Sequence, residues 1–359
     1  MLTGATPSLL NNSMPDLALR HSQNPILSPS QVQPSRPDMK VECLLNPGVF
    51  YFDGLVWLVV RVAERPVQEE GKLSFPVLKN DSVEILSFEL ADPLLDTTDP
   101  REPRYEGETF LSTLSHLRLF RSGDGVHFED AGLPILHGKG ELESYGIEDC
   151  RVATMNDGTY LLTYTATSSK GYGVGLRKTS NWKDFEEMGM ILPPANKDCA
   201  IFESKVNDKY YCFHRPSGVG LGGNFIWLAS SPDLQHWGNH ICLAETRKEM
   251  WDSNRIGAGA APIMTKEGWL AIYHGADYEN RYCLGALLLD KQNPANVIAR
   301  SEKPLMEPLE DYEQKGFFGN VVFTNGHLRQ DDEITLYYGA SDTVIGSAKF
   351  SITEILKTL

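Results

Sequence analysis

The 359-residue sequence predicts an all-β protein, a five-bladed β-propeller, from two kinds of repeat. The first is a hairpin unit, in which two aromatic and β-branched runs flank a tight turn such as Asp53-Gly54, a strong hairpin signal. This unit occurs five times, at residues 48–61, 151–164, 200–215, 261–274 and 320–338. The second is a polar turn that ends in an aromatic residue, at residues 121–128, 179–185 and 230–237. Such regular repetition is typical of four-stranded blades around an axis, whereas a β-sandwich would not explain the repeated turn.

The predicted domain organisation is an extended N-terminal arm over residues 1–40, followed by one propeller domain over residues 41–359. The arm is rich in Ser, Asn and Pro, and proline disfavours both helix and central strand. Residues 66–115 interrupt the repeat and are expected to form a long surface loop. Residues 353–356 are expected to form a helical turn.

Composition limits the classes of partner. A formal net charge of -15, with 41% hydrophobic and 23% charged residues, describes a globular protein without the basic surface that nucleic acid or anionic membrane requires. The first thirty residues lack a secretory signal, and no apolar run is long enough to span a membrane. We therefore expect a cytoplasmic protein with no nucleic-acid or membrane partner; a homo-oligomer is compatible with the sequence.

The six cysteines are scattered, and none has the spacing of a metal site. Most lie inside apolar runs, as small buried hydrophobic residues do in a reducing compartment. We therefore expect no metal ion and no disulfide.

The segment Gly146–Arg151 carries two adjacent acids, Glu148 and Asp149, directly before a predicted strand. A carboxylate beside a cation such as Arg151 can be held in one protonation state, although a solvated turn with a local ion pair is the ordinary alternative. Consecutive strand residues point to opposite faces of a sheet. We therefore expect the two carboxylates to diverge and Asp149 alone to face the channel.

Cationic residues gather at matching positions of the repeats, which a propeller brings to one face. Lys197, Arg215, Arg255 and His274 form this predicted cluster, and it suits phosphate or another small anion, whereas a single such residue is usually a solvated surface charge. An ordinary glycosidase needs a second carboxylate as base or nucleophile. One acid with an anion pocket instead favours phosphorolysis, in which phosphate is the nucleophile. The aromatic candidates for stacking on sugar rings are Trp251, Tyr278 and Tyr282.

Several dispersed motifs resemble those of glycoside hydrolase family 130, the mannoside phosphorylases, in the same order over residues 24–343. These motifs are Asn46-Pro47-Gly48, Gly146–Arg151, Asn196-Lys197-Asp198, His214-Arg215-Pro216, Trp251–Gly259, Tyr273-His274-Gly275 and Tyr338–Asp342. The sequence departs from the family pattern at Cys150, Ser204 and Ala261, where Pro, Glu and Pro are common. None of these departures removes a group with an assigned chemical role.

The resemblance implies a five-bladed propeller that cleaves β-mannosides with inversion, using inorganic phosphate as co-substrate and no cofactor, and releases α-mannose 1-phosphate. It implies that Asp149 is the general acid, with its proton delivered through a mannose hydroxyl. Phosphate would be bound by Lys197, Arg215, Arg255 and His274. Asn46, Arg61 and Asp342 would contact the sugar in the cleavage subsite, and further candidates for substrate binding are Arg151, Asp198, Asp277 and Tyr282.

Two alternatives remain open at this point. One is a β-mannosidase that uses water, although such members of the family lose the phosphate cations that this sequence keeps. The other is a non-catalytic carbohydrate- or protein-binding propeller, which would have no use for an acid opposite a cation cluster. The mannose–mannose linkage, with β-1,2 among the options, is not decided by the sequence.

Overall fold

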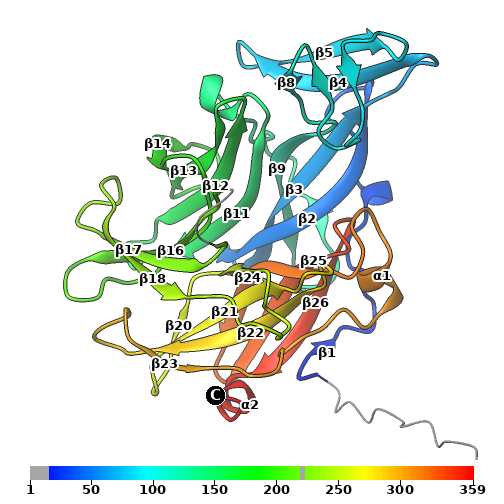
Figure 1. The fold of residues 1–359 in the computed structure, drawn as a ribbon. Coiled ribbons are helices and arrows are strands. Elements are labelled where there is room, and N and C mark those ends of the chain that lie inside the picture. Colours follow the sequence, from blue (N-terminus) through cyan, green and yellow to red (C-terminus); the bar gives the residue numbers. More distant parts are fainter. Residues whose placement is uncertain (1–15, 219–222) are drawn as a thin grey trace, which may run out of the picture.

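Five antiparallel sheets of four or five strands form the body of residues 16–218 and 223–359, the parts of the chain that this computed structural model describes (Figure 1). The fold is all-β, as predicted. In chain order, the first sheet contains β2 (Met39–Phe52), β3 (Leu55–Pro66), β9 (Leu114–Ser122) and β10 (Glu129–Asp130). The second contains β11 (Ile147–Thr154), β12 (Tyr160–Ser168), β13 (Gly171–Thr179) and β14 (Glu186–Leu192).

The remaining three sheets repeat this arrangement. The third contains β15 (Asn196–Ile201), β16 (Tyr210–Pro216), β17 (Ile226–Ser231) and β18 (Gly238–Ala244). The fourth contains β19 (Arg255–Ala258), β20 (Ile263–Met264), β21 (Trp269–Ala276), β22 (Tyr282–Leu289) and β23 (Val297–Arg300). The fifth contains β24 (Val322–Gln330), β25 (Glu333–Ala340), β26 (Val344–Ser351) and the arm strand β1 (Leu19–Arg20). All five predicted hairpins are confirmed as antiparallel strand pairs.

The core lies between the sheets. One cluster of buried apolar side chains joins the first sheet to the second, and others join the second to the third, the third to the fourth and the fourth to the fifth. A further cluster joins the fifth sheet back to the first, where β24 packs against β2. Each sheet therefore buries both of its faces, which explains why strands such as β12 are buried along nearly their whole length.

The repeated polar turn has one local mechanism. In each copy, one hydroxyl (Ser122, Thr179 or Ser231) accepts a hydrogen bond from the backbone N–H three residues later. In the second sheet this turn places Trp182 in the core, where its ring stacks on Phe50 with centroids 3.7 Å apart. In this copy, the turn thus places an aromatic side chain between neighbouring sheets.

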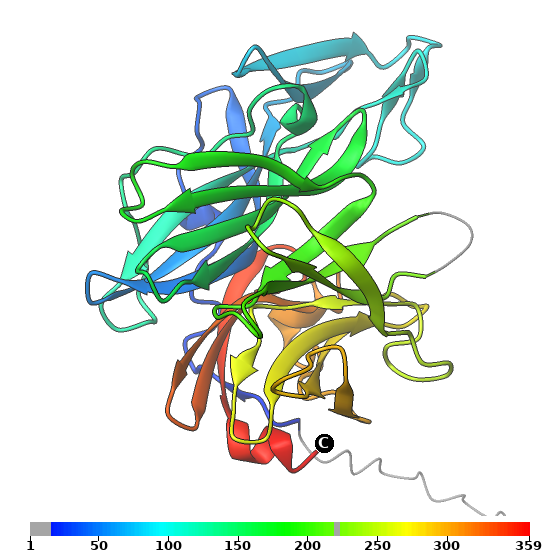
Figure 2. The same cartoon turned by 90° about the vertical axis from the view of Figure 1, so that its left-hand side faces the viewer.

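The insert at residues 66–115 is folded, so the expectation of a long surface loop was wrong. It contains a hairpin, β4 (Lys72–Lys79) and β5 (Ser82–Glu89), and a small sheet of β6 (Leu95–Asp96), β7 (Arg104–Tyr105) and β8 (Glu108–Thr109), at the top of the molecule (Figures 1 and 2). Its own core stacks Phe75 on Phe88 and Phe110, with centroids 5.2 Å apart in each pair. Tyr145 joins this core and so ties the insert to the segment that leads into β11.

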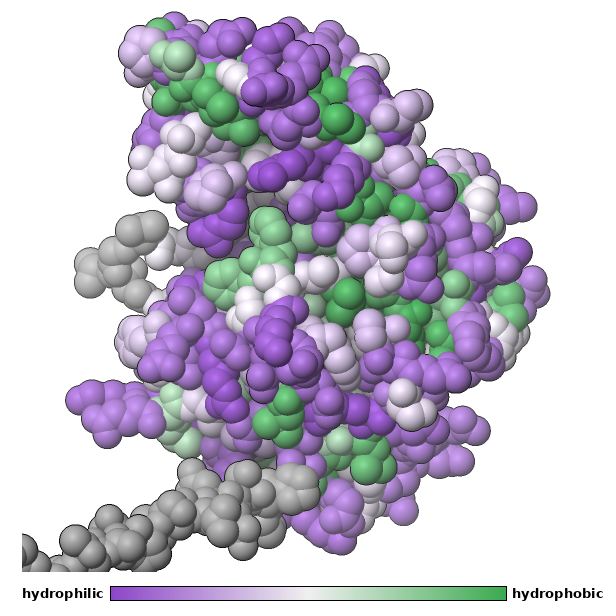
Figure 3. Space-filling model, turned by 90° about the vertical axis from the view of Figure 1, so that its right-hand side faces the viewer, coloured by the Kyte–Doolittle hydropathy of each residue, from purple (hydrophilic) through white to green (hydrophobic). Residues whose placement is uncertain are grey.

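The surface viewed in Figure 3 is mostly hydrophilic, with small separate hydrophobic patches, one of them over the insert at the top. Short helical segments are η1 (Pro29–Gln31), η2 (Glu141–Glu143), α1 (Asp311–Gln314) and α2 (Ile352–Leu356), the last of which confirms the predicted helical turn. None of the helices in the described ranges is long and apolar enough to cross a membrane. All six cysteines are unpaired, and five of them are buried.

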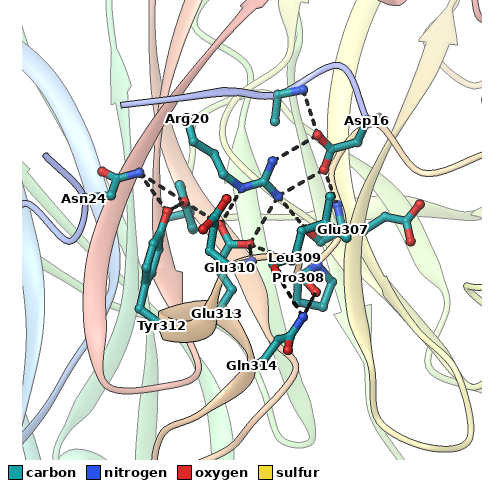
Figure 4. A network of polar contacts seen from close by, with 12 residues as sticks. Asp16, Arg20, Asn24, Glu307, Pro308, Leu309, Glu310, Tyr312, Glu313 and Gln314 are labelled. Atoms are coloured by element: carbon teal, nitrogen blue, oxygen red, sulfur yellow. Dashed lines mark hydrogen bonds and ion pairs between the residues drawn. The ribbon is translucent and has the colours of Figure 1, made fainter. Parts of the chain in front are cut away.

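The described part of the N-terminal arm is latched to the fifth sheet by a buried ion pair (Figure 4). β1 pairs with β26, and Arg20 Nε donates to Glu313 Oε1 over 2.8 Å. The Glu313 side chain has no exposed surface and also accepts hydrogen bonds from Tyr338 and from the backbone of Leu309. Residues 1–15 of the predicted arm lie outside the described residues, and the domain division at residue 40 stays a prediction.

Arg20→Met should destabilise the fold by about 3 to 5 kcal/mol, because it leaves the buried Glu313 carboxylate without its cation. Denaturant unfolding monitored by fluorescence measures this free energy. Lys315→Met is the matched control, since Lys315 pairs with Asp311 on the surface and such pairs contribute about 0 to 1 kcal/mol. Equal losses in both variants would contradict a buried latch.

Candidate active site

The first strands of three sheets, β2, β11 and β15, each have an irregularity next to a polar residue. In the described chain, the register between each of these strands and its paired neighbour shifts after Leu45 in β2, after Glu148 in β11 and after Lys197 in β15. The residues that follow, Asn46, Asp149 and Asp198, have left-handed φ angles of 35°, 50° and 54°. Asn and Asp adopt this conformation more readily than other non-glycine residues, and a bulge redirects the side chain it carries.

Asp149 is buried and is held by two donors from the first sheet. Its Oδ1 accepts from Asn46 Nδ2 over 3.0 Å and from Arg61 Nη1 over 3.1 Å. The other terminal nitrogen of Arg61 donates to Glu148 Oε1 over 2.9 Å. The expectation that Glu148 and Asp149 diverge was therefore wrong, because the bulge and the left-handed φ at Asp149 break the strand's alternation and both carboxylates reach one guanidinium.

The pKa values of two carboxyl groups in this cluster are shifted in opposite directions. Burial alone would raise the pKa of Asp149, but the charges of Arg61 and Lys197 and the hydrogen bond from Asn46 outweigh it and leave the pKa below its usual value. For Asp342, burial raises the pKa to about 6, with repulsion from Asp149 added and attraction to Arg61 opposing it. At pH 7 the unliganded site therefore holds an ionised Asp149 and an Asp342 that takes up a proton in mild acid.

A second cluster surrounds the carboxylate of Asp198, whose side chain has no exposed surface. Its Oδ1 lies 3.3 Å from Arg151 Nη2, and its Oδ2 lies 3.1 Å from Arg215 Nε and 3.3 Å from His274 Nε2. Burial opposes ionisation of Asp198, yet Arg215 and His274 more than offset it and hold its pKa well below the usual value. Burial lowers the pKa of His274 to about 4 despite Asp198, so at pH 7 its imidazole is neutral.

Several cationic donors in this region have no hydrogen-bond partner among the described residues. Arg215 Nε, Arg215 Nη1 and Arg255 Nε are all buried atoms of this kind, although Arg215 Nε is ion-paired with Asp198. Arg255 is held at its other nitrogens, by Tyr282 Oη and Asn280 Oδ1, each at 3.2 Å. The Lys197 amino group lies 5.9 Å from the centre of the Tyr172 ring. Because buried polar groups are normally paired, these donors indicate a site that a bound anion would complete.

Other predicted residues hold the site together. Arg151 donates to the backbone carbonyls of Ala258 and Gly259, each over 2.7 Å, and so links β11 to the segment around β19. Asp277 Oδ1 accepts from two backbone N–H groups of the turn that carries Asn280. Trp251 stacks on Tyr273 and donates to a backbone carbonyl, which shows a packing role, and Tyr278 is 77% exposed.

Sequence reasoning missed Asn325, which follows a fourth register shift, in β24. Its side chain is fully buried and donates from Nδ2 to the backbone oxygen of Asn46 over 3.1 Å, which supports the residue that contacts Asp149. The sequence did contain a signal for this residue, because Asn325 and Gly326 form an Asn-Gly pair inside the first strand of the fifth hairpin. Ser115 was also missed; its hydroxyl accepts from Arg61 Nε over 2.9 Å.

The geometry agrees with the comparisons to known proteins. A model of glycoside hydrolase family 130, described as β-1,4-mannooligosaccharide phosphorylase, matches residues 105–359. The chain belongs to glycoside hydrolase family 130. Within family 130, the β-1,2-mannobiose phosphorylase of Listeria innocua is 42% identical over 347 residues, covering 95% of this chain and 98% of that protein. The 1,2-β-oligomannan phosphorylase of a Thermoanaerobacter species is 39% identical over 67% of this chain and 80% of its own length.

A solved structure shows the same likeness in three dimensions. The Listeria innocua β-1,2-mannobiose phosphorylase in complex with β-1,2-mannobiose superposes with a TM-score of 0.91 and 40% identity, covering 95% of this chain and 99% of that one. Because it covers 95% of this chain, the likeness extends well beyond residues 105–359, the region matched by the family 130 model.

Asp342→Asn should raise the melting temperature at pH 8 and leave it unchanged or lower at pH 4. The folded-state pKa of Asp342, about 6, lies above the ordinary value of 3.8, so its contribution to stability is complete below pH 3.8 and is lost as the pH rises through 6. The amide of the Asp342→Asn variant does not titrate, so the variant does not lose this stability as the pH rises. Thermal unfolding of both proteins across this pH range measures the effect, and a variant that is less stable than the parent at pH 8 would contradict it.

Proposed function

We infer that this protein cleaves β-mannosides by phosphorolysis and releases α-mannose 1-phosphate. One observation carries the inference: Arg151 links Asp149 to Asp198, and Asp198 contacts Arg215, whose guanidinium has buried donors without a partner among the described residues. An acid near donors that can bind an anion is what phosphorolysis needs. Membership of family 130 and similarity to proteins named as mannoside phosphorylases support it.

We propose that the five sheets are the blades of a five-bladed propeller. Support comes from the successive packing of sheet against sheet and from the cluster that joins the fifth sheet back to the first. In this arrangement the inner strands β2, β11, β15, β19 and β24 surround one axis. The bulged residues of three sheets then converge on a single site near that axis.

The proposed reaction needs no base from the protein. A phosphate oxygen attacks the anomeric carbon from the face opposite the glycosidic oxygen; the new C–O–P bond forms as the glycosidic bond breaks, which inverts the configuration. Asp149 supplies the proton that the leaving oxygen takes up, through a mannose hydroxyl. Hydrogen phosphate brings one proton and ends as a phosphate ester, so its proton restores Asp149 and the reaction balances.

The lowered pKa of Asp149 in the unliganded site fits this sequence of events. An ionised Asp149 is not an acid, so its pKa has to rise once the substrates bind. A bound phosphate dianion would neutralise nearby cations such as Lys197 and repel the carboxylate, and both effects raise the pKa. Phosphate binding would thus prepare the acid as well as supply the nucleophile.

The roles of the remaining residues are assigned as follows. Phosphate is bound by Lys197, Arg215 and Arg255. His274 has no exposed surface and supports this cluster through its contact with Asp198. The mannose in the cleavage subsite is contacted by Asn46, Arg61 and Asp342. Tyr282 and the turn that begins at Asp277 lie beside Arg255, at the anion site. Arg151 acts through the backbone it holds. We further propose β-1,2-linked mannose as the substrate, from the two relatives named above, and a cytoplasmic location, from the six unpaired cysteines.

Asp149→Asn should lower turnover of β-1,2-mannobiose by at least about 100-fold, the lower range for loss of a general acid, while the fold is kept. Mannose 1-phosphate released with and without inorganic phosphate is the measurement. Asp157→Asn, in the exposed β11–β12 turn, is the matched control and should retain parental turnover. Equal cleavage by the parent protein with and without phosphate would indicate a β-mannosidase, and no cleavage in either case would indicate a binding protein.

Arg215→Met should raise the KM for phosphate by about 10- to 100-fold, because a hydrogen bond to a charged group contributes roughly 1.5 to 3 kcal/mol. The KM for mannobiose should change little, since the Arg215 guanidinium lies with the anion donors and not beside Asp149. Initial rates with each substrate varied in turn separate the two constants. Arg121→Met, which removes an exposed pair with Glu129, is the control; a parallel rise of both constants in Arg215→Met would contradict the assignment.

A further inference from the structure

Asp198 is the meeting point of side chains from three other strands. Its carboxylate lies within 3.3 Å of Arg151 from β11, Arg215 from β16 and His274 from β21. We propose that Asp198, with the space that Gly257 leaves for it, is a positioning residue that aims Arg215 at phosphate. This inference rests on the proposed function and extends it, because it names the groups that set the affinity for the anion.

Burial separates Asp198 from the residues that touch substrate. Its side chain has no exposed surface, whereas the Asp342 and Lys197 side chains are partly exposed. Both carboxylate oxygens already face nitrogen atoms of neighbouring residues. Asp198 therefore acts on the substrates through Arg215 and His274.

The contact with Asp198 fixes the direction of the Arg215 guanidinium. That group is planar and rigid, so holding Nε on one side sets where the terminal nitrogens point. Nε forms an ion pair with Asp198 Oδ2 at 3.1 Å, and neither Nε nor Nη1 has a hydrogen-bond partner in the described chain. The Arg215 side chain is 8% exposed, so little room is left for another orientation. The ion pair with Asp198 holds the Nε edge of the guanidinium, and Nη1 is left to bind an anion.

Gly257 explains how an aspartate fits in this position. A Cβ atom at residue 257 would lie 2.2 Å from Asp198 Oδ2 and 2.5 Å from His274 Nε2, closer than non-bonded atoms approach. The φ angle of Gly257 is not in the left-handed region, so the glycine is required for space and not for backbone conformation. β19 also keeps regular register with β21 at this point, unlike β11 and β15. Any side chain there would displace Asp198 or His274.

The test compares Asp198→Asn and Gly257→Ala with two matched controls. Asp252→Asn removes another fully buried carboxylate held by two arginines, Arg247 and Arg300, outside the anion cluster. Gly238→Ala adds a methyl group where no atom lies within 4 Å. For each variant, the KM values for phosphate and for β-1,2-mannobiose, kcat and the melting temperature are measured.

We expect both test variants to raise the KM for phosphate at least tenfold while the KM for mannobiose stays within twofold. Asp252→Asn should lower the melting temperature without changing the ratio of the two KM values, and Gly238→Ala should change neither. Parallel changes in both KM values, or a loss of melting temperature alone, would overturn the positioning role. If Asp198→Asn does not fold, Gly257→Ala decides by the same criteria.

Calorimetry with inorganic phosphate alone separates this inference from the proposed function. A parent protein that makes no mannose 1-phosphate, yet binds phosphate at least tenfold more tightly than Gly257→Ala, would contradict the proposed function and support the positioning role. A parent protein that is an active phosphorylase, with phosphate affinity equal to that of Gly257→Ala, would overturn the positioning role alone.

Discussion

The site depends on shifts of pairing register in the first strands of three sheets, β2, β11 and β15. A regular strand would send successive side chains to opposite faces, and in this fold both faces are covered by neighbouring sheets. The bulges at Asn46, Asp149 and Asp198 release three side chains from that alternation. Their left-handed φ angles suit Asn and Asp; the side chains of both form hydrogen bonds, and Asp can also bind and transfer a proton. Backbone irregularity and chemical function thus share the same residues.

The released side chains bring opposite charges together in a confined space, where an uncompensated charge would be costly. Around Asp149 the balance is kept by Arg61 and Asn46, and around Asp198 by Arg215 and its neighbours. The balance is not complete, because buried donors of Arg215 and Arg255 are left without partners in the described chain. In the proposed function, phosphate completes the balance and at the same time raises the pKa of the acid. Binding of the nucleophile and activation of the acid are then one electrostatic event.

Much of the fold was predictable, because hairpins and the repeated turn are local signals with known residue patterns. Convergence of Asn46, Asp149, Asp198 and Arg215 followed from their matching places in the repeats. The shared contact of Glu148 and Asp149 with Arg61 was not predictable, since a bulge depends on pairing with a neighbouring strand. The arm's latch was equally hidden, because Arg20 and Glu313 are 293 residues apart in sequence. The folded insert was missed because its core borrows Tyr145 from outside its own span.

A crystal structure of the protein with inorganic phosphate tests the central claim most directly. The account predicts a phosphate ion within hydrogen-bonding distance of Arg215 Nη1 and of the Arg255 guanidinium, with Arg215 Nε still beside Asp198. It also predicts that Asp149 stays with Asn46 and Arg61, on the side where the sugar binds. Phosphate bound elsewhere, or bound only after Arg215 has left Asp198, would contradict the proposal that these side chains are already arranged for this anion.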